Sequence, residues 1–234
     1  MTSFGLIAPP TNTVNEAEWE RMAPPDLALR VARMPLHTDT ESEAGRSALR
    51  EDLRSALREL RGCDLMVYGC TAGSMVLPLD SLTAFMQELA GVPAVATAPA
   101  LVHACRALGL SRVALATPYH DSLNAHEVGF FAAARIETVS VRGLGIGAGG
   151  AHEYVRIARV PPEQVYAHCR ATDVPAAQGL VVSCTDFRTL EVLPRLEAEL
   201  GKPVLSSNLA TFWMALRTAG RNERIAGFGR LLER

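Results

Sequence analysis

The feature that most constrains this sequence is a short pattern that occurs twice, once in each half of the chain. An apolar run at 65–67 leads through Tyr68-Gly69 into Cys70-Thr71, and a second run at 179–182 leads through Ser183 into Cys184-Thr185. Each copy is typical of a buried strand that ends in Cys-Thr, with small or polar residues that open a helix beyond it. The repetition predicts two related halves rather than one irregular domain.

Other landmarks recur with nearly the same offset. Asn12 and Tyr119, which end the first predicted strand of each half, lie 107 positions apart, and the two cysteines lie 114 apart. The Gly-x-Pro turns that begin at Gly91 and Gly201 are separated by 110 positions. We therefore expect an α/β fold of two Rossmann-like lobes with parallel sheets, related by a pseudo-twofold axis. Ligands of such sheets bind beyond the carboxyl ends of the strands, so the active site should lie in the cleft between the lobes.

The rest of the chain alternates short β-rich runs with helical periodicity, which favours parallel sheets. We assign residues 1–111 to the first lobe, with 208–234 packing back onto it, and 112–207 to the second. The expected strands are 4–8, 28–33, 65–69, 92–95, 112–116, 136–141, 180–183 and 203–205, with a last short one at 225–227. The expected helices are 16–22, 41–61, 79–90, 99–108, 121–134, one from 161, 189–200 and 208–218.

Composition restricts the class of protein. The chain has 234 residues, of which 48% are apolar and 21% charged, with a formal net charge of −2, so it has no electrostatic bias toward nucleic acid or an anionic membrane. No apolar run is long enough to cross a bilayer, and the N-terminus does not have the pattern of a signal peptide. Five irregularly spaced cysteines without a CxxC pair argue against a disulfide framework or a zinc site. The expectation is a reduced, cytoplasmic protein without a metal.

The two repeated cysteines are the strongest candidates for chemistry. A thiol between a strand end and a helix start is where a thiolate forms most easily, and small residues after Cys70 allow backbone N–H groups to approach an anion. We predict Cys70 and Cys184 as catalytic residues; the alternative for each is a small buried hydrophobic side chain. That alternative is favoured for Cys63, Cys105 and Cys169. No histidine adjoins either candidate in sequence, although His103, His120 or His126 could approach in the fold.

Polar residues beside these strand ends could bind a substrate. Asn12 offers an amide for a carboxylate, or it is a turn or helix-capping residue. Tyr119 offers a hydroxyl for a carboxylate or an enolate oxygen, or it only satisfies its own hydroxyl in the core. Three further hydroxyl groups are predicted to contact a substrate: those of Thr71, Ser74 and Thr185.

The glycine-rich segment 143–150 contains a loose GxGxxG, but no acidic residue follows at the end of a next strand, as a dinucleotide site requires. We interpret it as a flexible loop that could act as a lid. His152 and Tyr154 beyond it are weaker site candidates. Arg188 is more consistent with a surface salt bridge than with a substrate contact.

At these residues the chain resembles the aspartate/glutamate racemase superfamily, in the branch of maleate cis–trans isomerases and arylmalonate decarboxylases. The resemblance covers nearly the whole chain and depends on the opening GLIAPPTNT at 5–13, the two Cys-Thr pairs, Thr117-Pro118-Tyr119 and the Gly-x-Pro turns. It implies two Rossmann-like lobes, no cofactor, no metal, a small carboxylic-acid substrate and a homodimer.

By similarity to maleate isomerases, Asn12 and Tyr119 would hold the carboxylates and Cys70 would add to the alkene as a thiolate. The double bond would then become a rotatable single bond, and Cys184 would give and take the proton at the adjacent carbon. Tyr154 occupies a place where those isomerases carry asparagine, so a bulkier or aryl acid is an alternative substrate.

The sequence is compatible with three other functions. Arylmalonate decarboxylases do not carry the first cysteine, so Cys70 argues against that activity, while a related lyase remains an alternative. Amino-acid or hydantoin racemases use both cysteines, one on each face of the α-carbon. A non-catalytic protein that binds a small acid would keep the cleft but tolerate loss of either sulfur.

Overall fold

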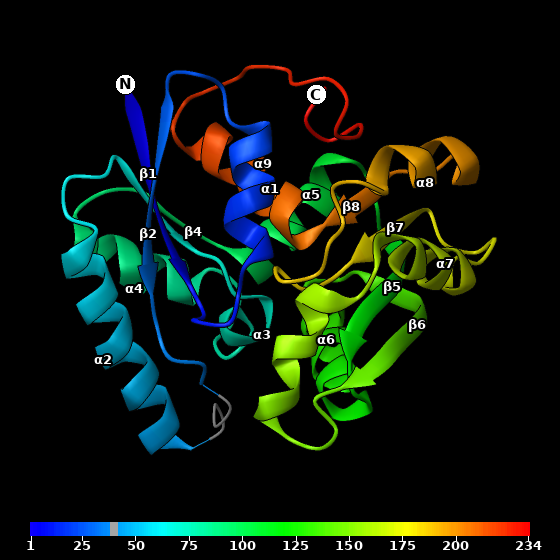
Figure 1. Ribbon diagram of the computed structural model, residues 1–234, viewed down its shortest axis with the longest axis horizontal. Helices are drawn as coiled ribbons and strands as arrows, with labels where there is room; N and C mark the ends of the chain where they lie inside the picture. The colour runs from blue at the N-terminus through cyan, green and yellow to red at the C-terminus, as the bar shows by residue number, and fades with distance from the viewer. Residues whose placement is uncertain (38–41) are drawn as a thin grey trace.

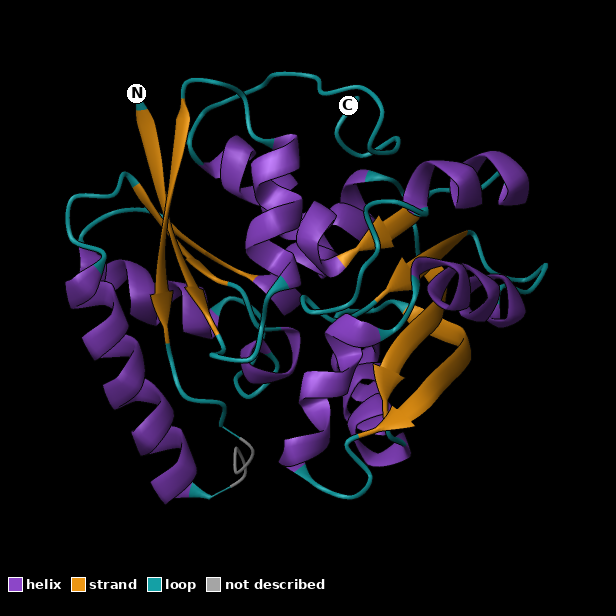
Figure 2. Ribbon diagram, viewed as in Figure 1, coloured by secondary structure: helices purple, strands orange, loops and turns teal. Residues whose placement is uncertain are grey.

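The computed structural model describes residues 1–37 and 42–234 and contains two parallel sheets (Figures 1 and 2). The first sheet has the strand order β2-β1-β3-β4, and the second has the order β6-β5-β7-β8, which is the same order shifted by four strands. The strands of the first sheet are β1 Thr2–Ala8, β2 Leu27–Arg33, β3 Leu65–Tyr68 and β4 Ala94–Ala96. Those of the second are β5 Arg112–Tyr119, β6 Glu137–Ile146, β7 Gly179–Val182 and β8 Val204–Ser206. The predicted α/β fold of two lobes is confirmed.

Helices flank both sheets. In Figure 1, α2 and α4 cover the outer side of the first sheet, while α1, α5 and α9 lie in the region between the two sheets. The helices that follow strands of the first sheet are α1 Val14–Met22, α2 Glu43–Glu59, α3 Thr71–Ser74, α4 Ser81–Ala90 and α5 Thr97–Ala107. Those of the second half are α6 Asp121–Ala133, the 3₁₀ helix η1 Ala151–Arg159, α7 Pro162–Thr172, α8 Leu193–Leu200 and α9 Ser207–Thr218.

Apolar spacing explains why these segments fold as they do. Leu49, Leu53 and Leu57 recur every fourth residue in α2 and are buried, whereas the charged positions between them face solvent. The oxygen of Ser42 accepts the Gly45 N–H at 3.0 Å and so caps the start of this helix. Strands β3 and β7 are buried on both sides, as central parallel strands are.

The repeated Gly-x-Pro turns have the same geometry in both halves. Gly91 ends α4 with φ +69°, and Gly201 ends α8 with φ +67°, a left-handed conformation that glycine adopts without strain. Each turn leads directly into the outermost short strand of its sheet, β4 or β8. Helices α5 and α9, which follow these strands, pack extensively against each other. Helix α9 also contacts β3 and β4 of the first sheet.

Strand register brings the predicted site residues to one edge of each sheet. Ile7 of β1 lies beside Tyr68 of β3, and Ala116 of β5 lies beside Val182 of β7. Asn12 and Cys70 therefore follow neighbouring strand ends in one lobe, and Tyr119 and Cys184 do so in the other. These carboxyl edges are where ligands of parallel sheets bind.

Some local predictions were wrong. No helix begins directly after Cys184: residues 185–192 are turns and irregular backbone, and α8 starts at Leu193 rather than at 189. The Thr185 and Asp186 side chains bond to the other lobe instead. The expected loop at 143–150 belongs to β6 as far as Ile146. Residues 225–227 form no strand.

Glu41, included in the expected helix 41–61, lies outside the described residues. No helix within the described ranges combines the length and apolarity that a membrane crossing requires.

Candidate active site

Both repeated cysteines line one cavity of about 280 Å³ between the two lobes. The first lobe contributes Asn12, Cys70 and Thr71, and the second contributes Tyr119, Cys184 and Thr185, together with Tyr154 of η1. The remaining lining residues are Pro9, Thr11, Leu36, His37, Ala72, His120, Ser122, Leu123, His126, Ile157 and Asp186. This size is at the lower end of ordinary ligand pockets, so a small substrate fits best.

Cys70 lies at the start of the short helix α3. Its side chain caps this helix, with the Gly73 N–H donating to Sγ at 3.4 Å. The hydroxyl of Tyr68, a fully buried residue of β3, donates a second hydrogen bond to the same sulfur. A Cβ at position 73 would collide with that hydroxyl, so glycine there makes room for it. Burial raises the pKa of the Cys70 thiol, and these two donors lower it again.

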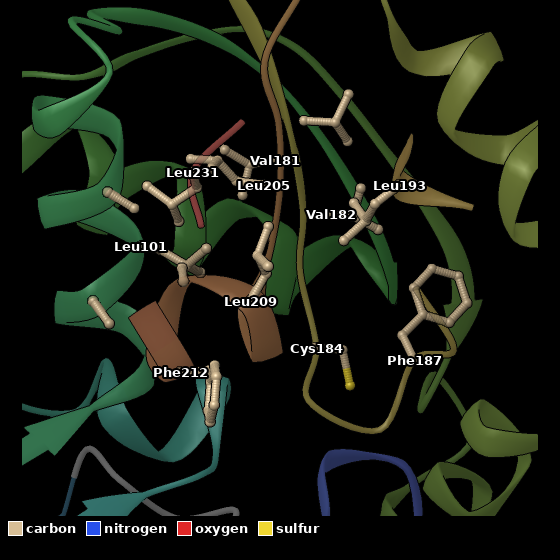
Figure 3. Close-up of a cluster of buried hydrophobic side chains, with 14 of the residues drawn as sticks. Leu101, Val181, Val182, Cys184, Phe187, Leu193, Leu205, Leu209, Phe212 and Leu231 are labelled. Carbon is tan, nitrogen blue, oxygen red and sulfur yellow. The ribbon is translucent and has the colours of Figure 1, made fainter. Parts of the chain in front are cut away.

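Cys184 lies two residues after the end of β7, at the start of a turn, with φ +102°. A positive φ is strained for a residue with a side chain, and such strain concentrates at functional sites. The turn is held by the Cys184 N–H, which donates to Ser207 Oγ at 3.0 Å. In Figure 3 the sulfur points away from the apolar side chains of Val181 and Val182. Burial raises the pKa of Cys184 far above its usual value, and the charge of Asp186 raises it further; the hydroxyl of Tyr119 opposes both.

Asn12 and Thr185 join the two lobes beside the cysteines. Asn12 Oδ1 accepts the N–H groups of Val14 and Asn15 at 3.1 and 3.0 Å, which caps α1, and its Nδ2 donates to Thr185 Oγ1 at 2.9 Å. Thr185 Oγ1 in turn donates to the Gly69 carbonyl at 3.0 Å. One amide hydrogen of Asn12 stays available to a ligand, whereas the Thr185 hydroxyl is already used within the protein.

The other predicted residues differ in where they lie. Thr71 lines the cavity and shares a 2.9 Å hydrogen bond with Ser207. Tyr154 lines it as well, half-buried, with its ring against the Gly147 backbone. Ser74 is not among the lining residues: its hydroxyl donates to the Thr71 carbonyl at 2.9 Å and accepts the Ala98 N–H at 2.8 Å.

Several weaker candidates lie at the surface. Arg188 pairs with Glu191 at 3.1 Å, and His103 contacts Asp80 at 3.1 Å. His120 and His126, two of the histidines considered from the sequence, line the cavity instead. Among the described residues, no group of three or more histidine, cysteine or acidic side chains is arranged to hold a metal ion.

Sequence reasoning missed Asp186. This residue lines the cavity two positions after Cys184, and its Oδ1 accepts the N–H groups of Thr13 and Val14 at 2.9 and 3.3 Å. Burial raises its pKa to about 6, against those two donors. Its nearness to Cys184 in sequence could have identified it. No lysine or arginine occurs among the described lining residues, so a substrate anion would be held by neutral donors and histidines.

A buried clamp fixes the distance between the lobes. The carboxylate of Glu18 on α1 accepts the N–H groups of Thr189 and Leu190 at 2.7 and 2.8 Å, and it accepts Asn208 Nδ2 at 2.7 Å. Trp19 Nε1 donates to the Asn208 carbonyl at 3.1 Å. The clamp joins α1, the segment after Cys184 and α9. It therefore helps to hold the two cysteines, one from each lobe, in the lining of the same cavity.

With this geometry established, comparison with known proteins identifies the family. The family model described as arylmalonate decarboxylase matches residues 5–232. An arylmalonate decarboxylase of Bordetella bronchiseptica is 32% identical over 99% of this chain and 96% of its own length. A maleate isomerase of Nocardia farcinica is 28% identical over 98% of this chain and 94% of its own.

A solved structure agrees with these sequence matches. It is a cysteine-to-serine mutant of the Nocardia farcinica maleate cis–trans isomerase with a covalently bound succinylcysteine intermediate. It superposes with a TM-score of 0.88 at 26% identity, covering 99% of this chain and 98% of that one. These relatives are enzymes, and the superfamily resemblance seen in the sequence is confirmed. The chain belongs to the arylmalonate decarboxylase family, in the branch of the aspartate/glutamate racemase superfamily that also contains maleate isomerases.

Proposed function

We propose that this chain is a cis–trans isomerase of maleate or a related small dicarboxylate, in which Cys70 adds to the double bond and Cys184 moves a proton. The observation that carries the proposal is that both sulfurs line one small cavity, from opposite lobes, together with Asn12 and Tyr119. The covalent succinylcysteine in a relative supports the addition step. The reaction needs no cofactor, because one thiol supplies the nucleophile and the other the acid.

The reaction begins and ends with both cysteines as free thiols. Cys70 loses its proton to solvent through the open cavity, and Tyr68 and Gly73 stabilise the thiolate with two hydrogen bonds. The thiolate adds to one alkene carbon, and the Cys184 thiol gives its proton to the other. The former double bond rotates as a single bond. The Cys184 thiolate then takes back a proton from the same carbon, and Cys70 leaves as the trans alkene forms.

One substrate carboxylate would be held by the second amide hydrogen of Asn12, a lining residue whose other amide hydrogen bonds to Thr185. The other carboxylate would take the Tyr119 hydroxyl, which would turn to it from the Cys184 sulfur. Tyr154 narrows the pocket between the lobes, and it would favour either a compact dicarboxylate or a flat ring stacked on its face. Thr71 and Thr185 contribute by fixing this arrangement, and Ser74 by supporting the backbone at Thr71. We also predict that two copies of this chain form a homodimer.

The test follows maleate by proton NMR in deuterated buffer. We expect fumarate from the wild-type protein. With Cys184→Ser we expect a succinyl adduct at Cys70, seen by intact-mass measurement, in which the second carbon takes its proton from water. Absence of both the product and the adduct would remove maleate as a substrate.

Two alternative functions have specific support. A two-base racemase also needs thiols on both sides of a small substrate, and the decarboxylase relative is 32% identical. Racemisation must exchange the α-hydrogen of an amino acid or hydantoin with deuterium, and decarboxylation of an aryl-malonate releases carbon dioxide. One panel of these substrates therefore distinguishes all three activities.

A further inference from the structure

A buried acid lies behind the cavity wall and has no role in the reaction as described so far. Glu127 is on α6, one turn after Leu123 and next to His126, both of which line the cavity. Its side chain is fully buried, with 0% exposed, and it is not a lining residue. Neither carboxylate oxygen has a hydrogen-bond partner within the described part of the chain. A buried carboxylate without partners lowers the stability of the fold, which indicates a functional role for it.

The neighbours of Glu127 connect it to Cys184. Ser183, the residue before Cys184, is also fully buried, and its hydroxyl is unpartnered among the described residues. Asn124, one turn before Glu127, bonds to Thr117 and to the Tyr119 carbonyl, and the Ser183 N–H donates to the Ala116 carbonyl, so both unpartnered groups lie at the same end of β5. The Ser183 hydroxyl moderates the rise that burial causes in the pKa of Glu127, which reaches about 7. The charges of Glu127 and Cys184 both raise the pKa of the Tyr119 hydroxyl. Glu127 therefore lies near Ser183, which precedes the second cysteine in the chain, and near Tyr119, whose hydroxyl acts on that cysteine.

Few other charges act on this carboxyl. Strands β5 and β6 pack against α6, and their ionisable side chains are Arg112, Tyr119, Glu137 and Arg142. Of these four, only Tyr119 is buried. On α6 itself, Asp121 and His126 are exposed to solvent. No cation therefore compensates a negative charge on Glu127 from these elements, and that charge acts on the Tyr119 hydroxyl at the cavity wall.

We propose that Glu127 is a positioning residue for Cys184: its buried carboxylate, behind Ser183 and Tyr119, keeps the second cysteine as a thiol until the substrate takes its proton. This rests on the proposed function, in which Cys184 is the proton donor. A negative charge nearby disfavours a second negative charge on sulfur. Once Cys184 has given up its proton, the same charge makes the thiolate a stronger base, so the proton returns readily. No bond to Glu127 forms or breaks.

The test does not require a substrate. Resting protein is alkylated with iodoacetamide at about pH 8, where thiolates react and thiols do not, and peptide mass spectrometry gives separate rates for Cys70 and Cys184. We expect Glu127→Gln to raise the ratio of the Cys184 rate to the Cys70 rate about tenfold, which corresponds to a fall of one pKa unit at Cys184. Asp121→Asn, which removes an exposed charge from the same helix, should leave the ratio unchanged.

An unchanged ratio in folded Glu127→Gln protein, with folding judged by circular dichroism, overturns the proposal. If that variant does not fold, Ser183→Ala replaces it: loss of the hydroxyl should leave Glu127 more protonated and raise the ratio in the same direction, and no change would again refute the role. In turnover assays on maleate, Glu127→Gln should lower kcat increasingly as pH rises, with KM unchanged. Lack of turnover with every acid tried would count against the proposed function but not against the alkylation result.

Discussion

Cys70 and Cys184 follow corresponding strands of two sheets with the same strand order, yet their surroundings differ. Cys70 receives hydrogen bonds from a tyrosine hydroxyl and a helix N–H. Cys184 also has a tyrosine partner, but Asp186 lies beside it and adds a negative charge. The duplicated fold therefore places two chemically different thiols across one cavity. Burial raises the pKa of both thiols, but two donors limit the rise at Cys70, whereas Asp186 adds to the rise at Cys184. Cys70 therefore loses its proton more readily than Cys184, which suits an addition followed by a proton transfer.

Replacing each sulfur in turn tests this comparison most strongly. We expect Cys70→Ser and Cys184→Ser each to lower kcat by about 10³-fold or more, because each removes an essential group. The two variants should differ in what they trap: Cys184→Ser should still form an adduct with maleate, whereas Cys70→Ser should not. Intact-mass measurement reads this directly. Adducts in both variants, or in neither, would mean that the two thiols have not been assigned their correct roles.

Asp186→Asn sharpens the comparison through stability. The folded state raises the pKa of Asp186 to about 6, so between about pH 4 and 6 the native protein binds more protons than the unfolded chain. Asp186 therefore stabilises the folded state at low pH, and this contribution to the free energy of unfolding is lost as pH rises through 6. Asparagine keeps the acceptor for Thr13 and Val14 but does not titrate.

The variant should consequently gain stability over the wild type as pH rises from 4 to 6, by at most about 3 kcal/mol. Urea unfolding at several pH values measures the difference. It should also bind dicarboxylates more tightly at neutral pH, because one negative charge has left the cavity. A stability difference that does not vary with pH would show that Asp186 does not titrate in this range.

The contrast between the two cysteines also shows what the sequence could reveal. The repeated strand-Cys-Thr pattern and the common offsets were sufficient to predict two parallel sheets. They also predicted that Asn12, Cys70, Tyr119 and Cys184 lie at one cavity. Local periodicity carried this information, because buried central strands and Gly-x-Pro turns are defined by neighbouring residues.

Long-range contacts carried the rest. The segment after Cys184 has a helix-like composition, but it forms turns because Thr185 and Asp186 bond to the opposite lobe. Ser74 looks like a site hydroxyl in sequence and supports the backbone in the fold. Tyr68 could not be recognised, because its hydroxyl reaches Cys70 only where Gly73 leaves space. Such pairings depend on the tertiary structure rather than on spacing.

Tyr68→Phe tests the nucleophile side with a smaller expected effect. Loss of the hydroxyl removes one of the two donors that stabilise a Cys70 thiolate, so the pKa of Cys70 should rise further. We expect kcat/KM to fall about tenfold near neutral pH, since a hydrogen bond to a charged group is worth about 1.5–3 kcal/mol. The rise of kcat/KM with increasing pH, which follows deprotonation of Cys70, should move to higher pH. A pH–rate profile measures both effects. An equal loss at every pH would indicate a packing role only.

Cys105→Ala should have the smallest effect and serves as the reference for all the others. Cys105 lies on α5 with 0% of its surface exposed, and burial without a hydrogen-bonding donor raises its pKa to about 12. It is therefore an apolar core side chain, and loss of its sulfur should cost about 1 kcal/mol of unfolding free energy through lost packing. Turnover and the alkylation rates of Cys70 and Cys184 should match the wild type. A loss of activity greater than the loss of folded protein would mean that α5, which packs on α9, transmits structural changes to the cavity.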